Sequence, residues 1–573
     1  MNVIHFPWIN GQRILQSGTL RNSGLIQKYN LTFSNAISIL CQIMSTKYQI
    51  LTGVRPLKMK VLSISSMILI MALIISGCGD HKIKYPPVPA NSKAGSLISE
   101  NRTFKTKSAK YKADFGTLVV PENRDKSDSR LIEIPVIRIH SQGDKPAEPV
   151  FGLTGGPGMS NMKWKPLDSL LANHDFVMVG YRGVDGSSVL DCPEIKKALK
   201  TDDDLLSEQA LRNISKSWTD CANRLTNDGI DINGYTIMEV IEDIEAARAA
   251  LGYKRINLLS ESYGTRVAYL YGVRHPAGIH RSAMIGVNPP GRLHWEPATI
   301  DAQLKYYSEL WSRDPDMTKR SPDLLNTIRD VIQNMPRKWL FFSINPGKVR
   351  TVTFALLYHR TTAAVIFNAY VAAKNGDPSG LALMSLAFDY VMPPMFTWGD
   401  LASKAVSADF DPSRNYLTEL DPPDSILGSP LGKLLWGPLS LASWPVKPIS
   451  EEYRRLQYSD VETLLISGSV DFSTPAEYAT KELLPYLRNG HQAVLSEIGH
   501  VNDVWKVKPE TTDRLLTSFY NTGVPDTSLS TYTAMDFNVK WGFPATAKAL
   551  LGIMIVAAAI IIAGLTWFLI SSG

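Results

Sequence analysis

Residues 255–274 read RINLLSESYGTRVAYLYGVR, an apolar run that passes directly into a helical pattern. The run RINLLS has the length and apolar content of a buried strand, and the residues from about 265 to 274 predict a helix. Ser262 lies at the junction, with the small residues Ser260 and Gly264 two positions to either side. A sharp turn here would hold the Ser262 hydroxyl clear of the sheet edge, so we predict that Ser262 is a nucleophile.

A serine hydroxyl is a weak nucleophile unless a base is oriented beside it, and two downstream segments supply the missing groups. Asp471 follows a predicted strand at 462–467, and His500 follows a predicted strand at 492–497. The chain order Ser, Asp, His is that of α/β-hydrolases. We therefore predict a triad of Ser262, Asp471 and His500, in which His500 transfers the proton and Asp471 fixes its tautomer. A helix-capping aspartate and a surface histidine are the alternatives.

A glycine-rich segment, TGGPG at 154–158, follows a predicted strand near the start of the domain. Acyl transfer requires backbone N–H groups aimed at the developing oxyanion, and glycine allows such close approach. Pro157 has no N–H group, so we predict Gly156 as one donor and Tyr263, which follows the nucleophile, as the other. A simple tight turn is the alternative. No metal-ligand cluster or dinucleotide fingerprint accompanies these residues in the sequence, so we expect neither a cofactor nor a metal.

Predicted strands alternate with helices on both sides of one long insertion. The strands are at 115–121, 131–140, 149–154, 175–180, 255–260, 282–287, 462–467 and 492–497, with helices at 239–251, 265–274 and about 476–488. Between about 289 and 450 the strands stop, which indicates a mainly helical insertion. The alternation predicts the α/β-hydrolase fold, with a mostly parallel central sheet, flanking helices and a helical cap. The expected domains are a core at 104–290 and 451–525 and a cap at 291–450.

The N-terminal region has the pattern of an export signal. Residues 61–77 are uncharged and apolar, they follow Lys58 and Lys60, and Cys78 comes next. We predict a signal peptide at 59–78 that ends in a bacterial lipobox, with Cys78 lipidated as the mature N-terminus. An uncleaved signal anchor is the alternative. Residues 1–58 are then expected to be an unusual leader or an over-extended start outside the fold.

A second apolar segment, 549–570, contains no charged residue. It is long enough to cross a bilayer, and Trp567 near one end is typical of a membrane interface. We predict a transmembrane helix; a buried core helix is the alternative. The protein is therefore expected to be held at a membrane through the lipid anchor, this helix or both. Its catalytic domain would lie outside the cytoplasm, at the cell surface or in the periplasm.

Two further cysteines, Cys192 and Cys221, lie in the predicted catalytic domain. In an exported protein they are expected to form a disulfide, and two free buried thiols are the alternative. The net charge is only +6 over 573 residues, and the basic residues form no long run, so no nucleic-acid partner is indicated. No pattern indicates an oligomeric state.

Several motifs together resemble the proline iminopeptidase and tripeptidyl aminopeptidase family of serine peptidases. They are GGPG at 155–158, RGVDGSS at 182–188, SYGTR at 262–266, GSVDFSTP at 468–475 and the dipeptide GH at 499–500. The segment DCP at 191–193 and Cys221 also resemble the paired cysteines of secreted members. Three positions depart from the family pattern, with Thr154 in place of histidine, Gly180 in place of aspartate and Ser260 in place of glycine.

The resemblance implies an enzyme that releases N-terminal proline, other N-terminal residues or short peptides through an acyl-enzyme. Such enzymes need an anionic group in the cap for the substrate ammonium, and the insertion offers several acids, including Glu296, Asp301, Glu309 and Asp323. An esterase or lipase is the first alternative, because the same triad also cleaves small esters. A non-catalytic, membrane-tethered binding protein on a hydrolase scaffold is an alternative of another class.

Overall fold

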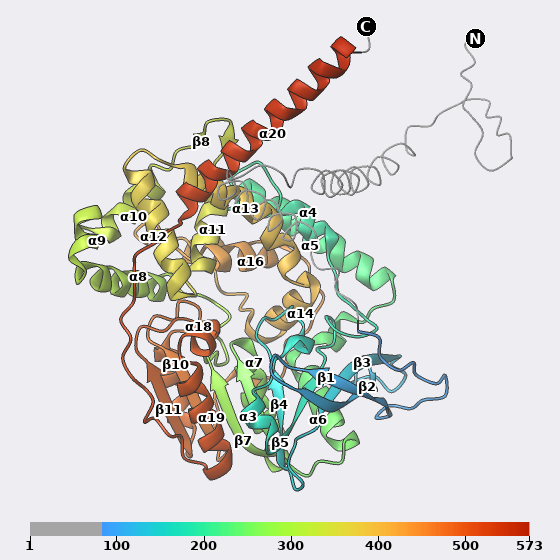
Figure 1. Ribbon diagram of the computed structural model, residues 1–573. Helices are drawn as coiled ribbons and strands as arrows, with labels where there is room; N and C mark the ends of the chain where they lie inside the picture. Colours follow the sequence, from blue (N-terminus) through green and yellow to red (C-terminus); the bar gives the residue numbers. More distant parts are fainter. Residues whose placement is uncertain (1–82, 572–573) are drawn as a thin grey trace, which may run out of the picture. The chain divides into compact units, whose positions relative to one another are not determined.

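The structure is a computed structural model that describes residues 83–571 (Figure 1). The leader predicted at 1–58, the signal peptide predicted at 59–78 and its lipidation site Cys78 lie outside the described residues and remain predictions. The unit described below begins at Tyr85.

A sheet of nine strands organises the described chain. The strands lie in the order β1-β2-β3-β5-β4-β6-β7-β10-β11. Their bounds are β1 Leu97–Lys105, β2 Lys110–Pro121, β3 Leu131–Ile139, β4 Ala147–Leu153, β5 His174–Val179, β6 Ile256–Glu261, β7 Ile279–Ile285, β10 Glu462–Gly468 and β11 Gly490–Leu495. The pairs from β5 to β11 are parallel, whereas β1, β2 and β3 are antiparallel to their neighbours. The prediction of a mostly parallel sheet is confirmed.

The strand order changes direction at β4, which lies between β5 and β6 although it precedes both in the sequence. At such a switch point the connections leave the carboxyl ends of neighbouring strands in opposite directions and open a crevice. β4 ends at Leu153, just before the glycine-rich loop, and β6 ends at Glu261, just before Ser262. The two segments predicted to carry chemistry therefore meet at this edge of the sheet.

Helices cover both faces of the sheet. One apolar cluster contains residues of α5 Glu208–Asn227, α6 Ile237–Ala250 and α7 Tyr263–Arg274, and another contains residues of α3 Asp168–Leu171, α18 Val501–Val507 and α19 Pro509–Thr522. On β5, Val177 and Val179 belong to the first cluster, whereas Phe176 and Met178 belong to the second. Side chains alternate between the faces of a strand, so a strand covered on both faces is apolar throughout.

Two local predictions differ from the structure. The sequence pattern misses β1, because this edge strand is largely polar and mostly exposed. The helix predicted at about 476–488 is instead a π-helical turn, Tyr478–Leu483, followed by a 3₁₀ turn, Leu484–Tyr486. Pro485 has no N–H group with which to continue an α-helix, which explains the break.

The insertion between β7 and β10 forms the cap, which is mainly helical as predicted. Its elements are α8 Pro297–Ser312, α9 Pro315–Arg320, α10 Leu324–Gln333, β8 Lys338–Trp339, β9 Phe342–Ser343, α11 Pro346–Leu356, α12 Arg360–Lys374, α13 Ser379–Met395, α14 Trp398–Asp409, α15 Tyr416–Glu419, α16 Pro430–Leu441 and α17 Glu451–Arg454. The apolar cluster of the cap also takes in Val470 and Phe472, on either side of Asp471. The loop that carries Asp471 is therefore packed against the cap.

One helix of the described chain, α20 Phe543–Ser571, is long and apolar enough to cross a membrane. Its most apolar window has a mean hydropathy of 2.7, and none of that window is buried. This helix includes the segment predicted at 549–570 and begins earlier, with Pro544 and Ala547 buried in its first turns.

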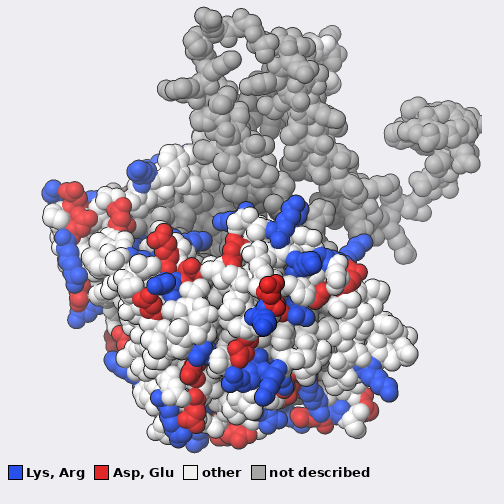
Figure 2. Space-filling view, turned by 60° about the horizontal axis from the view of Figure 1, so that its bottom comes forward, with Lys and Arg blue, Asp and Glu red and all other residues white. Residues whose placement is uncertain are grey.

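Charged side chains of both signs are interspersed over the face of the molecule seen in Figure 2. Many exposed charges of the described chain form ion pairs, such as Lys319 with Asp316 at 2.9 Å and Arg488 with Asp460 at 3.0 Å. This mixture agrees with the small net charge of +6.

A disulfide joins Cys192, just before α4 Pro193–Ala198, to Cys221 in α5. Both cysteines are buried.

Because the bond closes a loop with a sequence separation of 29 residues, a Cys192→Ser/Cys221→Ser variant is expected to lose about 3–4 kcal/mol of unfolding free energy. Urea unfolding of the variant beside the oxidised and reduced parent chain measures this loss. Equal stabilities for oxidised and reduced parent would contradict the expectation.

Candidate active site

Ser262 lies on a sharp turn between β6 and α7. Its φ and ψ angles are 51° and −123°, a strained conformation for a residue with a side chain. Its N–H group donates to the Ile285 carbonyl at the end of β7 at 2.8 Å, which fixes the turn to the neighbouring strand. At Gly264 a Cβ atom would lie 2.2 Å from the Leu153 carbonyl oxygen, so glycine is required for α7 to pack against β4.

The structure pairs Asp471 with His500. His500 Nδ1 lies 2.8 Å from Asp471 Oδ2, and both side chains are buried. Thr474 Oγ1 donates to the same carboxylate oxygen at 2.9 Å, while the N–H groups of Ser473 and Thr474 donate to Oδ1 at 2.9 and 2.8 Å. These donors fix the direction in which the carboxylate faces the imidazole.

His500 and Ser262 each lie next to the end of β7. A Cβ atom at Gly286 would lie 2.9 Å from His500 Cε1, so the imidazole ring rests against this glycine. The preceding residue, Ile285, is the one whose carbonyl accepts from the Ser262 N–H. In the described chain Ser262 Oγ and His500 Nε2 form no hydrogen bond, and such contacts commonly tighten only when substrate binds.

The glycine-rich loop lies directly against the candidate nucleophile. A Cβ atom at Gly155 would lie 2.8 Å from Ser262 Cβ. Gly156, the predicted oxyanion donor, has φ +134°, a conformation that L side chains rarely adopt. Within residues 83–571, no backbone carbonyl accepts a hydrogen bond from the N–H of Gly156 or of Tyr263. Both N–H groups are therefore available to a ligand.

Buried polar residues that the motif search did not identify hold this loop in place. Asn161 Nδ2 donates to the carbonyls of Gly152 and Val179, and its Oδ1 accepts from the Thr154 N–H at 2.7 Å. The side chain thus ties the ends of β4 and β5 to the start of the loop. Buried asparagines have no distinctive spacing, so only the contacts identify this role.

A buried ion pair supports the other end of the loop. The Gly158 N–H donates to Asp400 Oδ2 at 3.1 Å, and Asp400 also pairs with Lys404 one turn along α14. Burial raises the pKa of Asp400 and lowers the pKa of Lys404, although each side chain counteracts the effect on the other. The cap therefore contributes directly to the geometry of the candidate oxyanion loop.

The three departures from the family pattern have different surroundings in the structure. Ser260 Oγ donates to the Ala283 carbonyl at 3.1 Å, between β6 and β7. A Cβ atom at Gly180 would lie 2.7 Å from Pro135 and 2.8 Å from Asp185, so there is no room for an aspartate. At Thr154 the backbone carbonyl accepts from the Tyr181 hydroxyl at 3.0 Å, a contact that does not depend on the side chain. None of the three replacements removes a group of the candidate triad.

The cap contacts His500 through the turn between α11 and α12. The His500 N–H donates to the Tyr358 carbonyl at 2.6 Å, and the two rings are 5.4 Å apart at their centroids. The neighbouring His359 is partly buried, with Nδ1 3.7 Å from Asp503 Oδ1. The sequence analysis did not identify Tyr358 or His359, since nothing in their spacing connects them with a histidine far along the chain.

The four cap acids considered for the substrate ammonium have other environments. Glu296 pairs with Arg414 at 3.0 Å, Asp301 accepts from the Ile426 N–H at 3.1 Å, and Asp323 caps α10 through the Asn326 N–H. Glu309 is exposed on α8. Three of the four are therefore already engaged within the cap.

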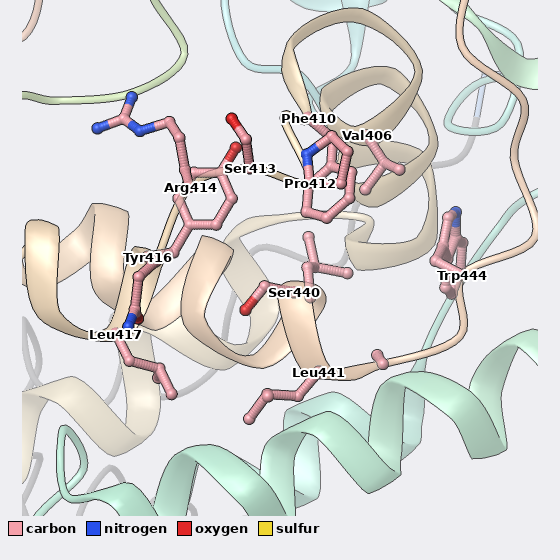
Figure 3. A pocket seen from close by; sticks show the side chains of 13 residues that line it. Val406, Phe410, Pro412, Ser413, Arg414, Tyr416, Leu417, Ser440, Leu441 and Trp444 are labelled. Carbon is pink, nitrogen blue, oxygen red and sulfur yellow. The ribbon is translucent and has the colours of Figure 1, made fainter.

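A cavity of about 510 Å³ lies within the cap, away from the candidate triad (Figure 3). Aromatic, apolar and polar side chains line it, among them Phe410, Arg414, Tyr416, Ser440 and Trp444. Its lining includes none of Ser262, Asp471 and His500. The cavity is therefore not the crevice at the sheet edge in which the chemistry is expected.

Glu261, next to the candidate nucleophile, is an unusual carboxyl group. Its Oε1 accepts from Trp505 Nε1, and burial raises its pKa to about 7, against the opposing effects of Trp505 and His500. A pKa raised above the unfolded value of 4.5 costs stability as pH rises from there to about 7, and the cost is complete above 7.

A Glu261→Gln variant is therefore expected to gain stability relative to the parent as pH rises from 5 to 8. The gain should be about 1–2 kcal/mol, less than for a fully buried group because Glu261 keeps some solvent exposure. Urea unfolding at both pH values measures it, with the exposed Glu452→Gln as the control. A gain that is the same at both pH values would contradict the role of this carboxyl group.

Comparisons with known proteins agree with this architecture. A family model described as alpha/beta hydrolase fold matches residues 148–324. Tripeptidyl aminopeptidase of Streptomyces lividans is 29% identical over 209 residues, which cover 33% of this chain and 38% of that protein. Serine protease Hip1 of Mycobacterium tuberculosis is 26% identical over 190 residues, covering 30% and 36%. The chain thus spans less than two fifths of the length of these relatives.

A solved structure, MGS-M2, an alpha/beta hydrolase enzyme from a Medee basin deep-sea metagenome library, is 13% identical with a TM-score of 0.34. The match covers 69% of this chain and 97% of that one. The assignment rests on the strand order, the turn at Ser262 and the family model. The chain has the α/β-hydrolase fold, and over about a third of its length it resembles tripeptidyl aminopeptidases.

Proposed function

We propose that the chain is a serine aminopeptidase that releases N-terminal residues or short peptides through an acyl-enzyme. The observation that carries the proposal is the Asp471–His500 pair, at 2.8 Å, at the same sheet edge as the strained turn of Ser262. The resemblance to a tripeptidyl aminopeptidase supports peptide rather than ester substrates.

In the proposed reaction Ser262 Oγ attacks the scissile carbonyl carbon while His500 Nε2 accepts the hydroxyl proton. Asp471 keeps the Nδ1 proton on the imidazole and stabilises the imidazolium that forms. The carbonyl oxygen becomes an oxyanion facing the free N–H groups of Gly156 and Tyr263.

Collapse of this intermediate breaks the bond to the leaving group and gives an acyl-enzyme. The leaving amine takes the proton from His500, so the imidazole is neutral again. A water molecule then attacks the acyl carbon, with its proton passing to His500. Release of the carboxylic acid returns the proton to Ser262 Oγ and restores the enzyme.

Activity measurements on the full chain test the proposal. The substrates are a proline anilide, a tripeptide anilide and a short-chain nitrophenyl ester, and a fluorophosphonate probe reports on Ser262. Labelling at Ser262 with cleavage of an anilide supports the aminopeptidase. Labelling with ester turnover alone would assign the chain to the esterases and lipases. A folded sample without labelling would favour the alternative of a non-catalytic binding protein on this scaffold.

We propose further that α20 spans a membrane and that the catalytic domain lies outside the cytoplasm. The exposed apolar surface of α20 supports the first part, and the Cys192–Cys221 disulfide supports an oxidising compartment. Retention in the membrane fraction after carbonate washing tests the helix. Digestion by protease added outside intact cells tests the side on which the domain lies. A lipid anchor at Cys78 and an export signal at 59–78 belong to the same proposal.

A further inference from the structure

An exposed apolar hairpin lies on the cap. Residues 337–343, RKWLFFS, form the hairpin of β8 and β9. Leu340 and Phe341, at its tip, are 61% and 69% exposed. Next to the tip, Trp339 and Phe342 face each other across the two strands, and their rings stack with centroids 5.7 Å apart. Two adjacent large apolar side chains in water are unfavourable unless another surface covers them.

The backbone of the hairpin tip is strained at Leu340. This residue has φ +55°, in the left-handed region that favours glycine or asparagine. A turn selected for folding alone would place one of those residues there, because it would relieve the strain and remove the exposed apolar surface. The strained backbone and the exposed leucine side chain together indicate that Leu340 has a role in binding another surface, rather than in stabilising the fold.

The hairpin and α20 are attached to the same helix, α13. Directly after the hairpin, the Asn345 N–H donates to Ser385 Oγ at 3.0 Å, and Lys348 pairs with Asp389 at 2.7 Å. Figure 1 shows β8 and the start of α20 on the same side of the molecule, next to α13. The surface of α13 also carries exposed apolar residues, namely Leu386, Tyr390 and Val391.

At the start of α13, Asp377 pairs with Lys548 of α20 at 2.6 Å, and a Cβ atom at Gly380 would lie 3.0 Å from Pro544. These contacts fix the direction in which α20 leaves the cap. The hairpin and the start of α20 are therefore parts of one body.

The length of α20 brings the membrane surface to the cap. Its first turns pack on the cap, whereas a Cβ atom at Gly552 would meet nothing within 4 Å. From there to Ser571 a helix rises about 30 Å at 1.5 Å per residue, which is the thickness of the hydrocarbon core. A bilayer crossed by this segment therefore begins close to the cap, where Lys540, Lys548 and Trp541, 59% exposed, are typical interfacial residues.

We propose that the tip of the β8–β9 hairpin inserts into the interface of the membrane that α20 spans. The inference rests on the proposal that α20 crosses a membrane. Leu340 and Phe341 would enter the boundary between headgroups and acyl chains, and Trp339 would lie at headgroup level. Arg337 and Lys338 precede them and would bind lipid phosphates, so the hairpin would favour an anionic leaflet. The cap is then held against the membrane at two points, and its orientation is fixed.

Photocrosslinking of the full chain in vesicles of phosphatidylcholine and phosphatidylglycerol tests the proposal. The photoreactive residue p-benzoylphenylalanine replaces Phe341, or Tyr458 as the control, which is exposed to a matching 67%. A third variant carries it at Ile561, in the middle of α20. We expect lipid adducts at positions 341 and 561, with the yield at 341 about tenfold above that at 458. An Arg337→Glu/Lys338→Glu change should lower the yield at 341 severalfold, without changing the yield at 561.

The outcomes separate the two proposals. Adducts at position 561 but none at 341 above the control would overturn the hairpin proposal and leave the membrane helix intact. No adducts at either position would overturn both. An adduct of position 341 with protein, and not with lipid, would also overturn the proposal and would indicate a protein partner for the tip. Adducts at 341 that survive the charge reversal undiminished would refute the preference for anionic lipid.

Discussion

Replacement of Ser262 by alanine is expected to lower kcat/KM on the cleaved substrate by about 10⁵- to 10⁶-fold. The change removes the nucleophile but leaves the Asp471–His500 pair and the glycine-rich loop in place. Alanine also fits the strained turn no worse than serine, so the variant should fold and keep its substrate affinity. Steady-state kinetics together with fluorophosphonate labelling measure the effect, and labelling should vanish.

Ser260 offers a matched control within the same pentapeptide. Its hydroxyl makes one hydrogen bond, to the Ala283 carbonyl, so Ser260→Ala should change kcat/KM by less than about tenfold. His500→Ala should approach the loss seen for Ser262→Ala, since serine and base act as a unit, whereas Asp471→Asn should cost about 10⁴-fold, because only the tautomer and orientation of His500 are lost. A Ser262→Ala protein that retains full activity would refute the triad.

Replacement of Asp409 by alanine is expected to lower the unfolding free energy by about 3–5 kcal/mol. Arg266 Nη1 lies 2.8 Å from each oxygen of this carboxylate, and both side chains are 1% exposed. The N–H groups of Gly291 and Leu293 donate to the same carboxylate at 3.2 and 2.9 Å. The variant would leave the buried Arg266 charge unpaired and would release the start of the cap from α7.

The pH dependence follows from the same contacts. Burial alone would raise the pKa of Asp409, but Arg266 and His294 hold it below its usual value of 3.8. The contribution of the pair is therefore complete above pH 3.8 and is lost as pH falls further.

Urea unfolding at neutral pH measures the loss for Asp409→Ala. Asp330→Ala breaks an exposed pair with Lys374 and should cost less than about 1 kcal/mol. Equal losses for the two variants would show that the buried pair does not hold the cap to the core.

Several features of this protein were predictable because they depend on local pattern. The strand and helix around Ser262 follow from the apolar run and the small residues, and the structure places the turn between β6 and α7. The same patterning predicts most strands of the sheet and the helical nature of the cap. It fails at β1, whose polar residues pair only because β2 lies beside them, and at 478–486, where a proline interrupts the helix.

The sequence by itself therefore determined the predictions of the fold, the candidate triad and the apolar helix, because each of them follows from a local pattern of residues along the chain. Only the tertiary structure decided which groups support them. Asn161 and Asp400 hold the glycine-rich loop, and Tyr358 contacts His500, through hydrogen bonds between segments far apart in the sequence. Such contacts leave no periodic pattern, because the partners become neighbours only when the sheet and the cap have packed together. The strained, exposed hairpin tip at Leu340 is likewise a property of the folded chain, and so is its attachment to the helix that holds α20.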